Sequence, residues 1–276
     1  LLLYVDDFMI AGDKKAVRET VAAMKEIWQL KGGDTHKLNE TPILGTQFFQ
    51  HMHEKGERVD IVVDQRAYAR HALDEFEKAT GVKPKDLPKR VDLPSVDDDQ
   101  NVIFEGDGPN AHDQALRGEY ATHGPKIIGI LMWLARTGWL HLTIGVNAIA
   151  REVSRWTAKV DRMAVRIFAY LYNNTEGVLL MRVAPRDLKE QKLKLLIFSD
   201  ADHAGNVSTR KSVSGAGLVL SGPNGTWALI DWVSRSQRTI SVSTAEAELL
   251  ASQVALREAL TVLILLDMLQ MEIFTL

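Results

Sequence analysis

Three strand-like segments followed directly by one long helix make up the last third of the chain, and this order limits the fold more than any other feature. The segments, residues 193–198, 212–220 and 226–233, are rich in apolar residues, and a Gly-Pro-Asn-Gly turn separates the last two. A helical pattern then runs from Thr244 to about Leu269. Strands joined by tight turns before a helix predict a mixed sheet and argue against a doubly wound parallel sheet. We therefore expect an α/β (α+β) fold.

The first 80 residues predict two hairpins, each followed by a helix. Two apolar runs flank Asp6 and Asp7, which is a hairpin signal, and residues 43–50 and 59–63 form the second hairpin. Asp13 and Asp64 are placed to cap the helices that follow. The expected core positions of these helices recur at helical spacing: Val17, Val21, Met24 and Trp28 in the first, which Gly32-Gly33 should end, and Ala69, Ala72, Leu73 and Phe76 in the second.

The middle of the chain divides it. Residues 82–119 contain four of the eight prolines, and from Asp92 to Glu119 there are eight acidic residues and one basic residue. Such a segment is typical of a linker or a long surface loop. Three helices should follow, ending near Asn174, with two apolar stripes: Ile127, Ile128, Leu131 and Leu134, then Val160, Ala164, Ile167, Phe168 and Leu171, with Thr157 as a cap. We expect four segments: 1–90, 91–120, 121–190 and 191–276.

Composition excludes several classes of protein. Hydrophobic residues make up 46% and charged residues 25% of the 276, with a net charge of −3, which fits a folded chain and excludes a uniformly basic one. The absence of cysteine rules out disulfide scaffolds and cysteine-based zinc sites. The most apolar run, residues 262–266, is followed by Asp267 and Glu272, so we expect no membrane-spanning segment. The chain has no initiator Met and no signal-peptide pattern, and we interpret it as a fragment.

Asp6 and Asp7 form the first candidate site. Two adjacent carboxylates repel each other, and a divalent metal would offset that repulsion, because Mg²⁺ prefers hard oxygen ligands. A polar turn is the alternative, since Asp favours turns without any metal. Spacing alone favours the turn.

Acidic residues in the last segment form the second candidate site. Asp200 and Asp202 lie where a predicted strand ends, which is a usual place for both site residues and turns. Ser243 and Glu246 fit a capping box at the start of the long helix. That leaves Glu248, beside the apolar face of the helix, without a structural role, and burying a carboxylate there is costly without a partner. We predict that Glu246 is a cap and that Glu248 is a metal ligand.

Basic residues lie near these acids. Arg210, Lys211, Arg235 and Arg238 are interleaved with Ser and Thr, a pattern that suits contacts to nucleic-acid phosphates. Ordinary solvated charge is the alternative. Trp227 and Trp232, at strand spacing, are expected in the core rather than stacked on bases.

Taken together, these motifs resemble the C-terminal part of a copia-type LTR-retrotransposon polyprotein, from reverse transcriptase into ribonuclease H. The resemblance covers nearly the whole chain, is weakest at residues 82–119, and keeps the family's motif order. It is carried by Tyr4-Val5-Asp6-Asp7, Gln65-Arg66-Ala67-Tyr68, Gly129-Ile130-Leu131-Met132-Trp133-Leu134-Ala135-Arg136-Thr137, Ser199-Asp200-Ala201-Asp202-His203-Ala204-Gly205, Arg210-Lys211-Ser212-Val213-Ser214-Gly215 and Ser243-Thr244-Ala245-Glu246-Ala247-Glu248.

The resemblance implies the end of a reverse-transcriptase palm with a helical thumb or connection, followed by a ribonuclease H-like mixed sheet plus helix. Asp6 and Asp7 would then be polymerase metal ligands, and Asp200 and Glu248 ribonuclease H ligands. Mg²⁺ or Mn²⁺ would be the cofactor for two-metal phosphoryl transfer. RNA, DNA, their hybrid and, in the full-length enzyme, dNTP would be partners, in the cytoplasm and without a membrane.

The resemblance also implies that both sites need further aspartates, upstream of Leu1 and downstream of Leu276. We therefore expect the chain alone to have little or no activity. The alternative hypothesis is a nucleic-acid-binding remnant of a decayed or domesticated element, in which the basic residues matter and the carboxylates do not.

Overall fold

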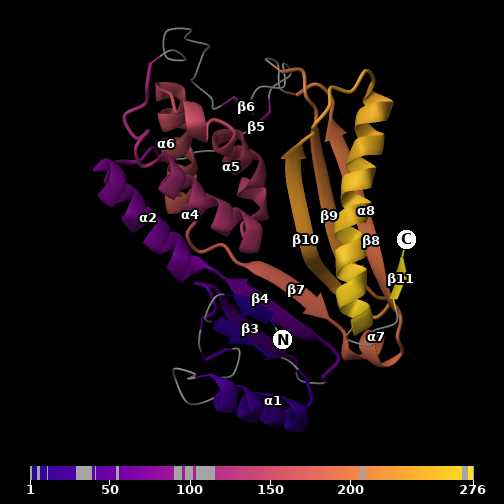
Figure 1. The fold of residues 1–276 in the computed structure, drawn as a ribbon. Helices are drawn as coiled ribbons and strands as arrows, with labels where there is room; N and C mark the ends of the chain where they lie inside the picture. Colours follow the sequence, from indigo (N-terminus) through magenta and orange to yellow (C-terminus); the bar gives the residue numbers. More distant parts are fainter. Residues whose placement is uncertain are drawn as a thin grey trace.

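The computed structural model describes residues 2–4, 7–10, 12–28, 39, 40, 42–53, 56–89, 95, 96, 102, 103, 116–205, 209–268 and 273–275. For 2–4, 7–9, 95, 96, 102, 103 and 273–275 it describes the backbone alone. The described part is a mixed α/β structure in which one sheet lies between a long helix and a group of shorter helices (Figure 1).

The main sheet has the strand order β11-β8-β9-β10-β7-β4-β3. Its six strands from β8 to β3 pair antiparallel, and β11 adds to the edge of β8 in parallel. A sheet with both kinds of pairing is the mixed sheet that the strand and helix order predicts. The strands are β3 (Gln47–Met52), β4 (Val59–Asp64), β7 (Leu179–Val183), β8 (Leu193–Asp202), β9 (Val213–Ser221), β10 (Trp227–Ser236) and β11 (Ile273–Thr275).

The long helix α8 (Thr244–Met268) covers one face of β8 and β9 (Figure 1). It approaches the sheet through a stripe of buried alanines, whose small side chains let the backbone come close. Leu195 of β8 and Leu218 of β9 are fully buried beneath it. The alanines are Ala247, Ala251, Ala255 and Ala259.

By length and composition alone, α8 could also cross a membrane, which corrects the expectation that no segment is apolar enough. The expectation considered only the short run ending at Asp267, whereas the apolar window extends further towards the start of the helix. This is weak evidence for a membrane span, because a helix that packs on a sheet through one face passes the same test.

A second core lies in what we call the helical module, formed by α2 (Arg66–Thr80), α4 (Gly124–Thr137), α5 (Thr143–Ala150) and α6 (Ala158–Asn173). The rings of Phe76 and Phe168 stack at its centre with centroids 4.0 Å apart, and each is almost fully buried. The apolar positions predicted for α2, α4 and α6 are all buried, so these predictions are confirmed. Thr157 is the N-cap residue of α6, although its side chain makes no capping hydrogen bond.

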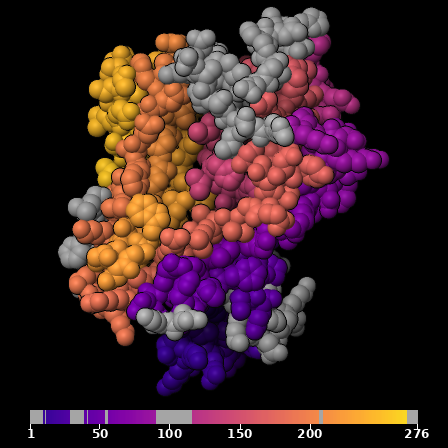
Figure 2. All heavy atoms as spheres, turned by 180° about the vertical axis from the view of Figure 1, so that it is seen from behind, coloured from indigo at the N-terminus to yellow at the C-terminus, as the bar shows by residue number. Residues whose placement is uncertain are grey.

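The helical module contacts the sheet along β10. Trp232 donates from its indole Nε1 to the carbonyl oxygen of Ala135 (2.8 Å), and Arg151 donates to the hydroxyl of Ser236 (2.6 Å). Asn147 donates to the carbonyl oxygen of Ser234, between these two contacts. Figure 2, seen from behind, shows the helices in contact with the later strands, and the indigo N-terminal part below both.

The N-terminal hairpin is present, with a small difference. β1 (Leu2–Tyr4) and β2 (Asp7–Met9) are antiparallel, and Tyr4 pairs with Asp7. Asp7 is therefore the first residue of a strand rather than part of the tip. Helix α1 (Lys14–Ile27) begins after Asp13, whose carboxylate accepts from the backbone N–H of Lys15 at 2.8 Å, as expected of a cap.

The end of α1 differs from the prediction. The helix ends at Ile27 rather than at Gly32-Gly33, because Trp28 has extended backbone angles (φ −125°, ψ 144°). Of the four positions expected on its apolar face, Met24 is buried, whereas Trp28 is 53% exposed.

Strand β7 was not expected, because it lies in the segment 121–190 that reads as helical. It pairs with β4 on one side and with β10 on the other. It therefore joins the second hairpin to the last three strands in one sheet. The remaining short elements are η1 (Pro84–Asp86), β5 (Ser95–Val96), β6 (Val102–Ile103), η2 (Leu140–Leu142), η3 (Val153–Arg155) and α7 (Pro185–Lys189).

Candidate functional site

The end of β8 and the start of α8 lie side by side, and they carry Asp200 and Glu248. The hydroxyls of Ser199 and Ser252 are 3.1 Å apart and form a hydrogen bond between the two elements. Asp200 follows Ser199 and is exposed, and Glu248 lies one helical turn before Ser252 and is half-buried. The structure thus brings the two elements together.

Asp200 and Asp202 lie on the same face of β8, because side chains alternate along a strand and β8 pairs with β9 without a break in register. This face is opposite to the one on which Ser199 contacts α8. Burial raises the pKa of Asp202, and the nearby charge of Asp200 raises it further, although Arg151 and His203 act in the other direction. Asp200 and Asp202 therefore form a small acidic cluster at the end of the strand.

Carboxylates are the ligand type that a hydrated divalent cation prefers, but Asp200 lies on the face of β8 opposite to the one that contacts α8, the helix that carries Glu248. Mg²⁺ commonly binds one or two carboxylates and completes its shell with water or phosphate oxygens. Asp200 and Glu248 offer carboxylates of that kind, one exposed and one half-buried. Within the described ranges, no group of three or more His, Asp or Glu residues could hold a metal. An ion held by one or both of these carboxylates would therefore keep much of its water.

The capping box at the start of α8 is confirmed. The backbone N–H of Glu246 donates to the hydroxyl of Ser243 (3.1 Å), and the Glu246 carboxylate accepts from the backbone N–H of Val242 (2.7 Å). Glu246 is therefore part of the cap. Its carboxylate binds the backbone N–H of Val242, one residue before Ser243, whose N–H is the donor in the usual capping box. Glu248 takes no part in the cap.

A buried polar network under the first turn of α8 was not predicted. Gln237 is 6% exposed, and its amide nitrogen donates to the hydroxyl of Ser214 (3.0 Å) and to the carbonyl oxygen of Ala247 (2.8 Å). Its amide oxygen accepts from the hydroxyl of Ser241 (2.7 Å). A glutamine between a strand and a helix has no periodic signal, so only the structure reveals it.

The four predicted basic residues differ in their surroundings. Arg235 forms an ion pair with Glu258 of α8, so its charge is already partnered. Arg210 and Arg238 are exposed and Lys211 is partly exposed, and these three have no ion pair within the part of the chain that the structure describes. Arg210 also has a positive φ of 55°.

The two tryptophans of β10 differ from each other. Trp232 is partly buried against Ala135, in keeping with the expected packing role. Trp227 is 52% exposed, so the expectation that it lies in the core is wrong. It is the first residue of β10, next to the turn that joins β9 to β10.

The first candidate site lies partly outside the described residues. Asp6 lies outside the described residues, and for Asp7 only the backbone of β2 is described. Their role as polymerase ligands stays a prediction.

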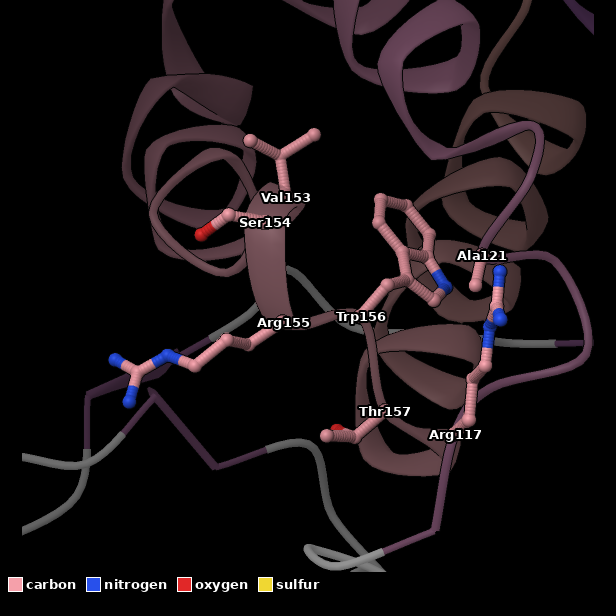
Figure 3. Close-up of a pocket in the computed structure, with 7 residues that line it drawn as sticks. All are labelled: Arg117, Ala121, Val153, Ser154, Arg155, Trp156 and Thr157. Carbon is pink, nitrogen blue, oxygen red and sulfur yellow. The ribbon is translucent and has the colours of Figure 1, made fainter.

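Two pockets lie away from these residues. The larger, of about 420 Å³, is lined by Arg117, Ala121, Val153, Ser154, Arg155, Trp156 and Thr157. Figure 3 shows Arg117 and Arg155 on opposite sides of Trp156, with their guanidinium groups far from each other. The second pocket is lined by Arg66 and Arg70; Asp64 forms an ion pair with Arg66, and Glu176 forms ion pairs with both arginines. Neither pocket contains a predicted site residue.

The chain is similar to a curated protein of a plant pathogen. The chain is 38% identical over 133 residues to secreted RxLR effector protein 161 of Plasmopara viticola, and the match covers 48% of this chain and 85% of that protein. No family model matches the chain. No solved structure matches it either.

Proposed function

We propose that this chain, which belongs to the same protein family as secreted RxLR effector protein 161 of Plasmopara viticola, is part of a copia-type retrotransposon enzyme. That enzyme would be an RNA-directed DNA polymerase with a ribonuclease H, acting by two-metal phosphoryl transfer. Its substrates would be RNA, DNA, their hybrid and dNTP.

One observation carries the proposal. The antiparallel strands β8, β9 and β10 are followed by α8, and α8 starts beside the end of β8, so that Glu248 and Asp200 lie on adjoining segments. This matches the mixed sheet plus helix that the resemblance implies for ribonuclease H. The two acidic motifs are far apart in the sequence, and the fold brings their segments into contact.

Each group then has a chemical role. Asp200 and Glu248 would hold Mg²⁺ or Mn²⁺, and Arg210, Lys211 and Arg238 would contact the phosphates of a hybrid. When bound, the ion would stabilise negative charge on the phosphoryl group under attack. Asp6 and Asp7 would serve the polymerase site in the same way.

The description of the relative as a secreted effector stays with that protein. The match covers 48% of this chain.

We expect the double variant D200N/E248Q to bind Mn²⁺ at least about 10-fold more weakly than the wild type, since both carboxylate ligands lose their charge. Mg²⁺ should tighten binding of an RNA/DNA hybrid to the wild type but not to the variant. Titration of Mn²⁺ by electron paramagnetic resonance and of the hybrid by fluorescence anisotropy measures both.

The matched control is D74N/D267N, which removes two exposed carboxylates away from the site. It should bind Mn²⁺ and the hybrid as the wild type does. If D200N/E248Q leaves hybrid affinity unchanged both with and without Mg²⁺, the metal site is wrong. A hybrid affinity that then falls steeply with salt would favour the inert binding remnant.

A further inference from the structure

We propose that Gln237 is a positioning residue that fixes the first turn of α8 and thereby the carboxylate of Glu248. This inference rests on the proposed function, because it concerns the same metal site. The observation that supports it is different from the one that supports the metal site. The buried amide of Gln237 bridges Ser214 of β9 and Ala247 of α8, the residue before Glu248.

The hydrogen bonds of Gln237 to the first turn of α8 are directional, whereas the packing of the alanine stripe is not. The alanine stripe packs through apolar contacts, which resist separation from the sheet but scarcely resist a small slide or rotation of the helix. The amide of Gln237 instead donates to the carbonyl oxygen of Ala247, which is fully buried. This bond fixes the backbone immediately before Glu248.

Gln237 is itself held in one orientation. The carbonyl oxygen of Ala247 can only accept, so an inverted amide would turn its own oxygen towards that carbonyl and lose the bond, whereas the hydroxyls of Ser214 and Ser241 can each donate or accept. The carbonyl oxygen of Ser241 lies 3.3 Å from the Nε2 of His203, in the turn after β8. The network therefore links the segment after Asp200 and Asp202 to the turn that carries Glu248.

The test replaces Gln237 by methionine, which has a similar length but no donor. We expect Q237M to fold and to bind Mn²⁺ about 10-fold more weakly than the wild type, as expected when support of a metal ligand is lost. Amide hydrogen exchange at residues 248–251 should be faster. S241A removes the hydrogen bond to the amide oxygen of Gln237 but keeps both bonds that its amide nitrogen donates. We expect it to change Mn²⁺ affinity by less than about 3-fold, because it removes one neutral hydrogen bond that does not involve a metal ligand.

The matched control is Q65M. Gln65 is 1% exposed and donates to the hydroxyl of Thr46, far from α8 along the sheet. Q65M should lower stability and leave Mn²⁺ affinity unchanged. Should Q237M not fold, S214A/S241A carries the test, because it removes both side-chain partners of Gln237 and should also weaken Mn²⁺ binding.

The outcomes separate the two proposals. If D200N/E248Q binds Mn²⁺ as the wild type does, the metal site fails, and the role of Gln237 fails with it. If D200N/E248Q loses Mn²⁺ but a folded Q237M binds it with wild-type affinity, only the positioning role is overturned. Loss of Mn²⁺ affinity in Q237M, with Q65M unaffected, supports the inference.

Discussion

Replacing Asp187 by asparagine is expected to lower the free energy of unfolding by about 2–5 kcal/mol. Each buried donor that is left without its acceptor costs about 1–3 kcal/mol. The carboxylate of Asp187 is fully buried. It accepts from the backbone N–H and side-chain amide of Asn224 (3.0 and 2.7 Å) and from the backbone N–H and hydroxyl of Thr226 (3.2 and 2.7 Å). Asparagine offers one acceptor and turns an NH₂ group towards these donors.

The structural consequence should be local to the turn between β9 and β10. Asp187 lies in α7 and reaches across to that turn, so D187N should loosen the turn and leave the two donors on one of the two oxygen positions without an acceptor. Urea unfolding at pH 7 measures the change, with the exposed Asp86 as the control position for D86N. A loss below 1 kcal/mol, well under the cost of one unsatisfied buried group, would contradict the assignment.

The effect of D187N should also depend on pH. Burial alone would raise the pKa of Asp187, but the hydrogen bonds from Thr226 and Asn224 outweigh it and hold the pKa below its ordinary value. Because the pKa is lower in the folded state, the charged carboxylate stabilises the fold above about pH 4, the pKa of Asp in the unfolded chain. This stability is lost as the pH falls through the pKa of the folded state.

We therefore expect the unfolding free energies of wild type and D187N to converge between about pH 4 and pH 2, in the range below the ordinary Asp pKa. Urea unfolding at pH 7, 4 and 2.5 follows this convergence. A constant difference over the whole range would show that the charge of Asp187 is not what stabilises the turn.

Local patterns predicted most helices and strands, because their signals lie within a few residues. The spacing of Ala69, Ala72, Leu73 and Phe76 predicted the buried face of α2, and Ser243 and Glu246 predicted the start of α8. Trp28 and Trp227 were misplaced because their burial depends on which distant element covers them.

The parts that the sequence did not reveal depend on distant contacts. Strand β7 has five residues, and only its partners β4 and β10 distinguish it from a connecting loop. Asp187 and Gln237 are polar side chains whose partners lie 37–39 and 4–23 residues away, so no spacing rule indicates their burial. Asp200 and Glu248 could be named from their motifs, but only the contact between Ser199 and Ser252 places their segments together.

Replacing Phe168 by alanine is expected to lower the free energy of unfolding by about 3–5 kcal/mol, the usual cost of removing a buried aromatic ring and leaving a cavity. Phe168 is fully buried in the helical module and stacks on Phe76. Y172A on the same helix, at a position 40% exposed, is the control and should lose little. A loss of unfolding free energy below about 1.5 kcal/mol for F168A would mean that the helical module repacks around the gap, because core substitutions that are well accommodated cost no more than that.

The same variant tests whether the module and the sheet unfold together. Strand β7 follows α6 directly and lies inside the sheet, and β10 contacts α4 and α5 through Trp232, Asn147 and Arg151. We therefore expect one transition, shifted as a whole by F168A, whether it is followed by tryptophan fluorescence or by circular dichroism. Two transitions, of which only one moves, would show that the helical module is a separate domain, because a cavity at Phe168 destabilises only the unit that unfolds with it.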